Sequence, residues 1–138
     1  MKTKPQRSHC PISFALETFG DRWSLLILRD IIFRRKKHYR EFLNSGEKVS
    51  TNILADRLAK LEVEGLIAKA DDPLNGKQVV YSPTKKALDL VPMMLEMIQW
   101  SVKHDPSTDA PKDLMRRLKK NPNKLKKEIL FQFDEGQV

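Results

Sequence analysis

A short run of polar side chains near the middle of the chain could form hydrogen bonds with the edges of DNA bases. Thr51 and Asn52 stand at the start of a predicted helix, and an asparagine amide can pair with adenine through two hydrogen bonds. The sequence therefore predicts base contacts by four residues, which are Ser50, Thr51, Asn52 and Asp56. The alternative is that these residues cover the outer face of an ordinary amphipathic helix.

Residues 49–64 form that predicted recognition helix. Ser50 is suited to the N-cap, because its hydroxyl can accept a hydrogen bond from an amide of the first turn. Gly65 is suited to ending the helix. A helix of about 14 residues is ~21 Å long, which is enough to lie in a major groove and anchor at its far end. The apolar face that must be buried consists of Ile53, Leu54, Leu58 and Leu61.

Basic and polar side chains around this helix could contact DNA phosphates, and the cations among them would release counterions. The densest basic cluster is residues 34–40, which shortly precede the recognition helix. A solvated loop is the alternative interpretation of that cluster, and Arg57 could equally contact a phosphate or brace the fold. The predicted backbone contacts are Arg35, Lys36, Lys37, His38, Arg40, Arg57, Lys60, Lys77 and Gln78.

Two apolar segments precede the recognition helix. Residues 11–19 predict a first helix, and residues 23–33, which are more apolar, predict a central buried helix that Asp21 caps. Arg29 and Asp30 are expected at the wetter edge of this central helix.

A short helix and a turn are predicted between the central helix and the recognition helix. Residues 39–43 favour the short helix and residues 44–48 have the composition of a turn, so the three parts form a helix-turn-helix. Residues 66–70 and 78–82 predict the two strands of a hairpin whose turn spans residues 71–76, where the Asn-Gly pair of residues 75–76 is a strong hairpin signal. Such a hairpin after a recognition helix is a wing.

The segment that follows the wing carries more apolar residues than one helix face can bury. Pro92 should kink this segment or split it in two. Packing against a second copy of the chain is favoured over simple coverage of the domain's own core. The predicted contacts between the two copies are Phe14, Leu95, Ile98 and Trp100.

The predicted organisation has three parts. A loose basic N-terminus spans residues 1–9, a winged helix-turn-helix domain with its dimerisation helices spans residues 10–104, and a C-terminal helical extension spans residues 105–138. The extension contains two weaker helical stretches, at residues 113–120 and 122–133. The predicted fold class is therefore mainly α with a small β-hairpin, or α+β.

The composition favours an anionic partner and argues against several classes of protein. The 138 residues carry a formal net charge of +8, and one domain is the default for this length. No apolar run reaches the ~20 residues of a membrane span, and one cysteine cannot form an internal disulfide, so we expect a cytoplasmic protein. The sequence has no clustered metal ligands, no phosphate-binding glycine loop and no nucleophile elbow. We therefore expect that the protein is not an enzyme and that it binds no cofactor or metal.

Several motifs together resemble the HxlR-type transcriptional regulators, a branch of the bacterial winged-helix, MarR-like proteins. Residues 10–11 (Cys-Pro) resemble the family's opening, and residues 20–28 (GDRWSLLIL) resemble its Gly-x-[Lys/Arg]-Trp-x-x-Leu-Ile-Leu stretch. Residues 49–67 resemble its recognition helix and first wing strand. Residues 39–43 (YREFL) resemble its Arg-Phe-x-Glu-Leu motif with Tyr39 and Phe42 as departures, and residues 81–84 (YSPT) resemble its Tyr-x-Leu-Thr motif with proline in place of leucine. As a set, these motifs are specific.

The resemblance implies a homodimer that binds a palindromic operator in double-stranded DNA and regulates transcription, for example as a repressor. Two recognition helices related by a two-fold axis would enter major grooves about 34 Å apart, or a multiple of that distance. A small-molecule effector is compatible with this scheme. Two alternatives remain, namely a small basic RNA-binding protein and a winged-helix module for protein contacts.

Cys10 is the only cysteine, and some members of the family use a cysteine at this position to sense oxidants or electrophiles. Neighbouring His9 and Arg7 could favour its thiolate form. With one cysteine per chain, a disulfide must join two chains or a chain and a small thiol. The alternative is that Cys10 is a small apolar residue at the start of a helix. Cys10 is therefore a candidate redox sensor.

Overall fold

The computed structural model describes residues 8–135, and their contacts divide the chain into two compact units, one up to Thr84 and the other from Lys85. The predicted loose N-terminus falls mostly on residues 1–7, outside the described part. The described residues are mainly helical with one two-stranded antiparallel sheet, so the predicted fold class is confirmed. The predicted boundary at residue 104 stays a prediction. None of the described helices is long and apolar enough to cross a membrane.

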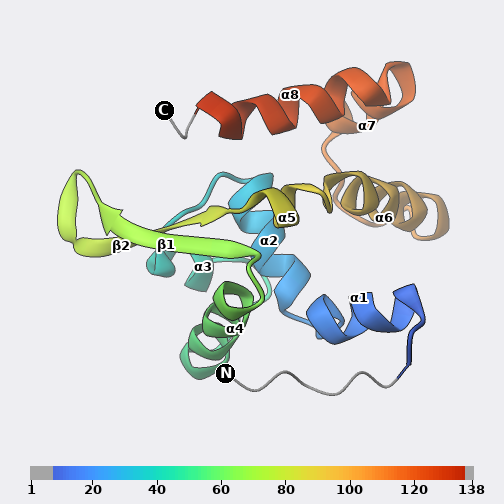
Figure 1. Ribbon diagram of the computed structural model, residues 1–138. Coiled ribbons are helices and arrows are strands. Elements are labelled where there is room, and N and C mark those ends of the chain that lie inside the picture. Colours follow the sequence, from blue (N-terminus) through green and yellow to red (C-terminus); the bar gives the residue numbers. More distant parts are fainter. Residues whose placement is uncertain (1–7, 136–138) are drawn as a thin grey trace. The chain divides into compact units, whose positions relative to one another are not determined.

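The described part of the first unit is a run of helices followed by a hairpin, and the hairpin projects beyond the helices of this unit (Figure 1). The hairpin directly follows the helix predicted to contact DNA, which is the arrangement of a wing. The elements are α1 (Pro11–Phe19), α2 (Ser24–Ile32), α3 (Tyr39–Leu43), α4 (Thr51–Val63), β1 (Ile67–Asp72) and β2 (Asn75–Pro83).

α2 is the central buried helix that the apolar spacing predicts. The carboxylate of Asp21 accepts hydrogen bonds from the amides of Trp23 (3.0 Å) and Ser24 (3.1 Å), so it caps the start of α2 as predicted. The most buried apolar side chains of α2, each at most 4% exposed, are Ile27, Leu28, Ile31 and Ile32.

Both ends of α4 are fixed by the local hydrogen bonds that the sequence predicts. The Ser50 hydroxyl accepts from the amide of Ile53 at 3.3 Å, which confirms Ser50 as the N-cap. Gly65 has a φ of +75°, and its amide donates to Glu62 O at 3.0 Å. The next amide in the chain donates to Leu61 O at 2.9 Å, which completes a Schellman motif.

Replacing Gly65 with alanine should destabilise the protein by about 1 kcal/mol, because a residue with a Cβ pays a conformational penalty at positive φ. A Cβ at Gly65 would meet no atom within 4 Å, so conformation accounts for the whole penalty. Gly46→Ala is the matched control, since its Cβ also meets nothing and its φ is not left-handed. Urea unfolding followed by circular dichroism measures both variants, and equal losses would contradict the prediction.

The turn of the hairpin lies inside the predicted segment but before its Asn-Gly pair. Asp72 pairs with Asn75, so Pro73 and Leu74 form the loop, and Asn75 and Gly76 already belong to β2. The loop therefore falls within the predicted turn of residues 71–76, but it is shorter than that turn and is not centred on the Asn-Gly pair. Pro73 fixes φ at the first loop position, and the Asp72 side chain accepts from the Leu74 amide at 2.9 Å. Together these two residues outcompete the Asn-Gly pair for the turn.

The described part of the second unit is helical, with α5 (Lys85–Leu88), α6 (Val91–His104), α7 (Lys112–Lys120) and α8 (Pro122–Glu135). Pro92 lies in the first turn of α6, where its missing amide costs no hydrogen bond, so the predicted split is confirmed. α7 contacts α8, and both helices match the predicted stretches of the extension. Their buried apolar side chains are Leu118, Leu125, Ile129 and Phe133.

Candidate nucleic-acid interface

One face of α4 is exposed and lined by short or polar side chains. Thr51, Asn52 and Asp56 are all exposed on this face, and so are Ala55 and Ala59 between and beyond them. The two alanines leave room for close approach to a ligand, because their side chains add little bulk. The opposite face holds the helix in the core through Leu54, Leu58 and Leu61, which are at most 3% exposed.

The first turn of α4 is tied to α3 as well as to its own cap. The hydroxyl of Tyr39, the first residue of α3, donates to the carbonyl of Thr51 at 3.1 Å. Tyr39 is a departure from the family motif, so the motif did not indicate this bond. The hydrogen bond holds the backbone of Thr51 and Asn52 at a fixed distance from α3, while both side chains stay exposed.

Asp21 braces the middle of α4 against the start of α2. Its carboxylate lies 2.9 Å from Nε of Arg57 and 3.6 Å from Nζ of Lys60. Burial raises the pKa of Asp21, but hydrogen bonds from Ser24, Arg57 and the amides of Trp23 and Ser24 outweigh burial and hold the pKa well below its usual value. Arg57 therefore braces the fold. A phosphate contact by Arg57 or Lys60 stays a prediction.

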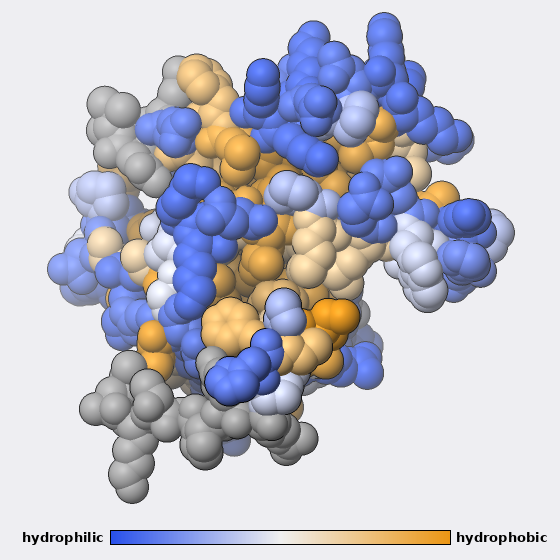
Figure 2. All heavy atoms as spheres, turned by 45° about the vertical axis from the view of Figure 1, so that its right-hand side comes forward, coloured by the Kyte–Doolittle hydropathy of each residue, from blue (hydrophilic) through white to orange (hydrophobic). Residues whose placement is uncertain are grey.

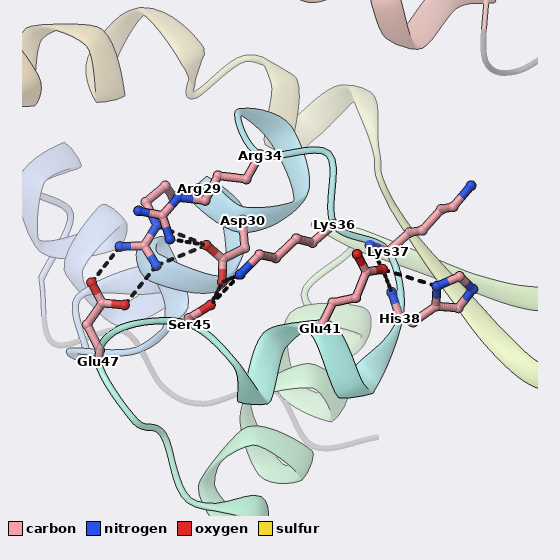
Figure 3. A network of polar contacts seen from close by, with 9 residues as sticks. All are labelled: Arg29, Asp30, Arg34, Lys36, Lys37, His38, Glu41, Ser45 and Glu47. Carbon is pink, nitrogen blue, oxygen red and sulfur yellow. Dashed lines mark hydrogen bonds and ion pairs between the residues drawn. The ribbon is translucent and has the colours of Figure 1, made fainter. Parts of the chain in front are cut away.

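Asp30 joins α2 to the basic cluster and to the turn of the helix-turn-helix (Figure 3). Its Oδ1 lies 3.0 Å from Nε and 2.9 Å from Nη2 of Arg29, and 3.2 Å from Nη1 of Arg34. Its Oδ2 accepts from the hydroxyl of Ser45 and lies 4.0 Å from Nζ of Lys36. Asp30 is only 2% exposed, so the expectation that it lies at a wetter edge is wrong. The cations that surround it make this burial tolerable.

Arg29 extends the same network into the turn. Its Nη1 and Nη2 lie 2.7 and 2.9 Å from the two carboxylate oxygens of Glu47, which is a bidentate ion pair. The hydrogen bond from Arg29 lowers the pKa of Glu47 from 4.5 to about 2. Because the folded pKa is the lower one, this stabilisation is present above pH 4.5 and is lost as the pH falls towards 2. No local pattern predicts this ion pair, because Arg29 and Glu47 lie 18 residues apart.

The predicted basic cluster is divided between the interior and the surface. Lys36 donates to the Ser45 hydroxyl at 3.1 Å, and its side chain is 21% exposed, so its ammonium is committed to the Asp30 network. Lys37 points away from the network (Figure 3). Arg35, Lys37 and Arg40 are exposed and lie within the same short segment as the start of α3.

Both ring nitrogens of His38 face carboxylates. Nδ1 lies 3.1 Å from Oε1 of Glu41, and Nε2 lies 2.9 Å from Oδ2 of Asp72 in the hairpin. The sequence predicted His38 as a phosphate contact, whereas the structure engages its ring with two acidic side chains.

The wing presents its polar residues on β2, just after the loop at residues 73–74. Lys77 is exposed and Gln78 is half-buried on β2, and the side chain of Asn75 accepts from the Lys77 amide at 3.2 Å. The base of the wing is attached to the basic cluster, since the amide of Tyr81 donates to the carbonyl of Lys37 at 2.8 Å.

The four predicted dimer contacts differ in exposure. Phe14 on α1 is 52% exposed and Trp100 on α6 is 67% exposed, whereas Ile98 is half-buried. Leu95 is 1% exposed and belongs to the core of the single chain, and the dimer contact predicted for it stays a prediction. Apolar side chains thus reach the surface in both units. Figure 2 shows orange, hydrophobic atoms at the surface of one face of the molecule. Cys10, directly before α1, is also exposed.

Known proteins share this sequence pattern and this arrangement of helices and hairpin. An HTH-type transcriptional regulator of Halalkalibacterium halodurans is 27% identical over 68% of this chain and 83% of its own length. YodB, an HTH-type transcriptional regulator of Bacillus subtilis, is 28% identical over 67% of this chain and 82% of its own length.

Solved structures share the fold. PA1607, whose crystal structure is known, is 31% identical to this chain in sequence. The two folds match with a TM-score of 0.65 over 78% of this chain and 71% of that one. Reduced YodB has a TM-score of 0.58 over 74% of this chain and 100% of its own. The model of the HxlR-like helix-turn-helix family matches residues 18–109, well over half of the sequence. The chain therefore belongs to the HxlR-like helix-turn-helix family and is a transcriptional regulator of the helix-turn-helix type, not an enzyme.

Proposed function

We propose that the chain is a homodimeric regulator that recognises a palindromic operator in double-stranded DNA through the first turn of α4. The observation that carries this proposal is the exposure of Thr51 and Asn52 on a helix fixed at both ends. A fixed helix places its side chains without a further loss of backbone conformational entropy on binding. Base contacts then come from Thr51, Asn52 and Asp56, with Ser50 at the cap.

The phosphate contacts in this proposal come from residues of the helix-turn-helix and of the wing. Arg35, Lys37 and Arg40 lie on the helix-turn-helix side, and Lys77 with Gln78 lies on the wing. Arg57 and Lys60 brace α4, so in this proposal they support DNA binding mainly by holding α4 in place. Each phosphate that a cation neutralises releases counterions, so affinity should fall steeply as salt rises.

The dimer in this proposal forms through helices whose apolar residues are exposed in the single chain. On α1 these are Ile12, Phe14 and Leu16, which are 71, 52 and 60% exposed, and on α6 they include Met97 and Trp100. Contact with a second copy would remove this apolar surface from water. A two-fold dimer also suits a palindromic site, because each half of the site meets one copy of α4.

The decisive experiment selects duplexes from a randomised DNA library with the purified chain and measures their affinity by fluorescence anisotropy. We expect enrichment of an inverted repeat, a dimer by analytical ultracentrifugation, and weak binding to RNA of equal length. Trp100→Glu should shift the protein towards monomer and weaken operator binding, whereas Lys103→Glu, an exposed change on the same helix, should leave the dimer intact. No enrichment, with a monomer at micromolar concentration, would overturn the proposal.

A thiol switch at Cys10 is a second element of the proposed function. The thiol is exposed, and it lies next to the exposed apolar face of α1 that we assign to the dimer. YodB is among the solved structures in both a reduced form and a diamide-treated form. With one cysteine per chain, diamide would oxidise two Cys10 thiols from two copies to one disulfide and would itself be reduced to the hydrazine.

We expect diamide to weaken operator binding by the wild-type chain and to leave Cys10→Ser unchanged. Non-reducing electrophoresis should show a covalent dimer of the wild type only, and dithiothreitol should restore binding. Cys10→Ser also serves as the folding control, because its untreated affinity should match the wild type. A loss of binding by treated Cys10→Ser would remove Cys10 from this role.

A further inference from the structure

His38 connects the start of α3 to the far end of β1. Its Nε2 lies 2.9 Å from Oδ2 of Asp72, and the two side chains are 24 and 11% exposed, so solvent competes with this contact only in part. Oδ1 of Asp72 meanwhile accepts from the amide of Leu74 at 2.9 Å. One carboxylate therefore shapes the turn of the wing and also holds the histidine ring.

The other side of the ring is anchored just as firmly. Oε1 of Glu41 lies 3.1 Å from Nδ1 of His38 and accepts from the amides of Lys37 (3.2 Å) and His38 (3.1 Å). This set of contacts fixes the Glu41 carboxylate on the first turn of α3. Both ring nitrogens donate a hydrogen bond only when the imidazole is protonated, because the neutral ring has one N–H. The charged groups around the ring are Glu41, Asp72 and, near Asp72, Lys37.

A hydrogen bond near the base of the wing also attaches it to this segment. The amide of Tyr81 on β2 donates to the carbonyl of Lys37 at 2.8 Å, and Tyr81 pairs with Lys69 on β1. Asp72 lies three residues beyond Lys69, which is about 10 Å along an extended strand. A hairpin held at one point can pivot about it, whereas one held at two separated points cannot. The contact between His38 and Asp72 supplies the second point.

We propose that His38 is a positioning residue for DNA binding, which clamps the wing to the helix-turn-helix through Asp72. The clamp keeps Lys77 and Gln78 at a fixed separation from Thr51 and Asn52, so that the wing and α4 meet one duplex together. This inference rests on the proposed DNA-binding function, and it gives His38 a role other than direct contact with phosphate.

Substitutions of two adjacent aspartates, Asp71 and Asp72, distinguish the loss of the clamp from the loss of a negative charge alone. Asp71→Asn removes a negative charge from an exposed residue of β1, and loss of repulsion should leave DNA affinity equal or higher. Asp72→Asn removes the same charge one residue away but weakens the clamp, so affinity should fall by about five-fold, the scale of a partly exposed ion pair. The asparagine keeps an oxygen for the Leu74 amide, so the turn persists. His38→Ala should show a similar loss, and combining it with Asp72→Asn should add little.

The same variants give a readout that does not require DNA. Hydrogen exchange of the free protein should quicken at the amides of residues 71–78 in His38→Ala and Asp72→Asn, and stay unchanged in Asp71→Asn. Amides of α2 should keep their wild-type rates in all three. Unchanged exchange in the hairpin of His38→Ala would overturn the clamp, and so would an equal acceleration in α2, which indicates general destabilisation. If the wild type bound no duplex, the proposed function would fail, while exchange would still decide the clamp.

Discussion

Asn52→Ala should weaken binding to the selected operator by about 30-fold while changing binding to random duplex by less than about two-fold. A bidentate contact to a base contributes roughly 1–3 kcal/mol of discrimination, and 30-fold corresponds to about 2 kcal/mol. Non-specific binding depends on phosphates, which the Asn52 amide does not neutralise. The measurement is anisotropy titration of both duplexes at one salt concentration.

Asn123→Ala is the matched control for this substitution. Asn123 is also exposed on a helix but lies in α8, outside the segment matched by the family, so both affinities should stay at the wild-type value. Because Asn52 is exposed, its loss should leave the unfolding midpoint unchanged. An equal loss of affinity on operator and random DNA would remove Asn52 from base recognition.

Asp30→Asn should destabilise the protein by about 3 kcal/mol. The substitution leaves Arg29, Arg34 and Lys36 around a neutral amide, and removing one partner from a buried ionic network is far more costly than losing an exposed pair. The partners are between 21 and 47% exposed, so the loss should fall at the lower end of the range for buried pairs. Equilibrium urea unfolding followed by circular dichroism gives the free energy.

Asp89→Asn is the matched control, because it makes the same chemical change at an exposed ion pair. Asp89 pairs with Lys85 at 2.6 Å, but their side chains are 63 and 81% exposed, so solvent screens the pair and the midpoint should not move. Ser45 of the helix-turn-helix turn contacts Asp30, so operator affinity of Asp30→Asn should fall as well. A midpoint for Asp30→Asn equal to that of the wild type would show that the network contributes no net stability.

Features that depend on neighbours a few residues away were predictable from the sequence. The cap at Ser50, the stop at Gly65 and the split at Pro92 each depend on local backbone chemistry, and the structure has all three at the predicted positions. Periodic apolar residues likewise indicated α2 as the buried helix, because helical geometry alone decides which side chains share a face. The turn of the wing falls within the predicted segment but not at its Asn-Gly pair, because two turn signals competed and Pro73 with Asp72 prevailed over Asn75 with Gly76.

Contacts between elements were decided only by tertiary structure. Arg57 meets Asp21 across 36 residues, His38 meets Asp72 across 34, and Ser45 meets Asp30 across 15. Charge and polarity suggested phosphate contacts for Lys36 and His38 and left Arg57 open between a phosphate and the fold, and packing brings all three beside acids of the same chain. A charged side chain pairs with the opposite charge that folding brings within a few ångströms. No local pattern in the sequence specifies which residue carries that charge.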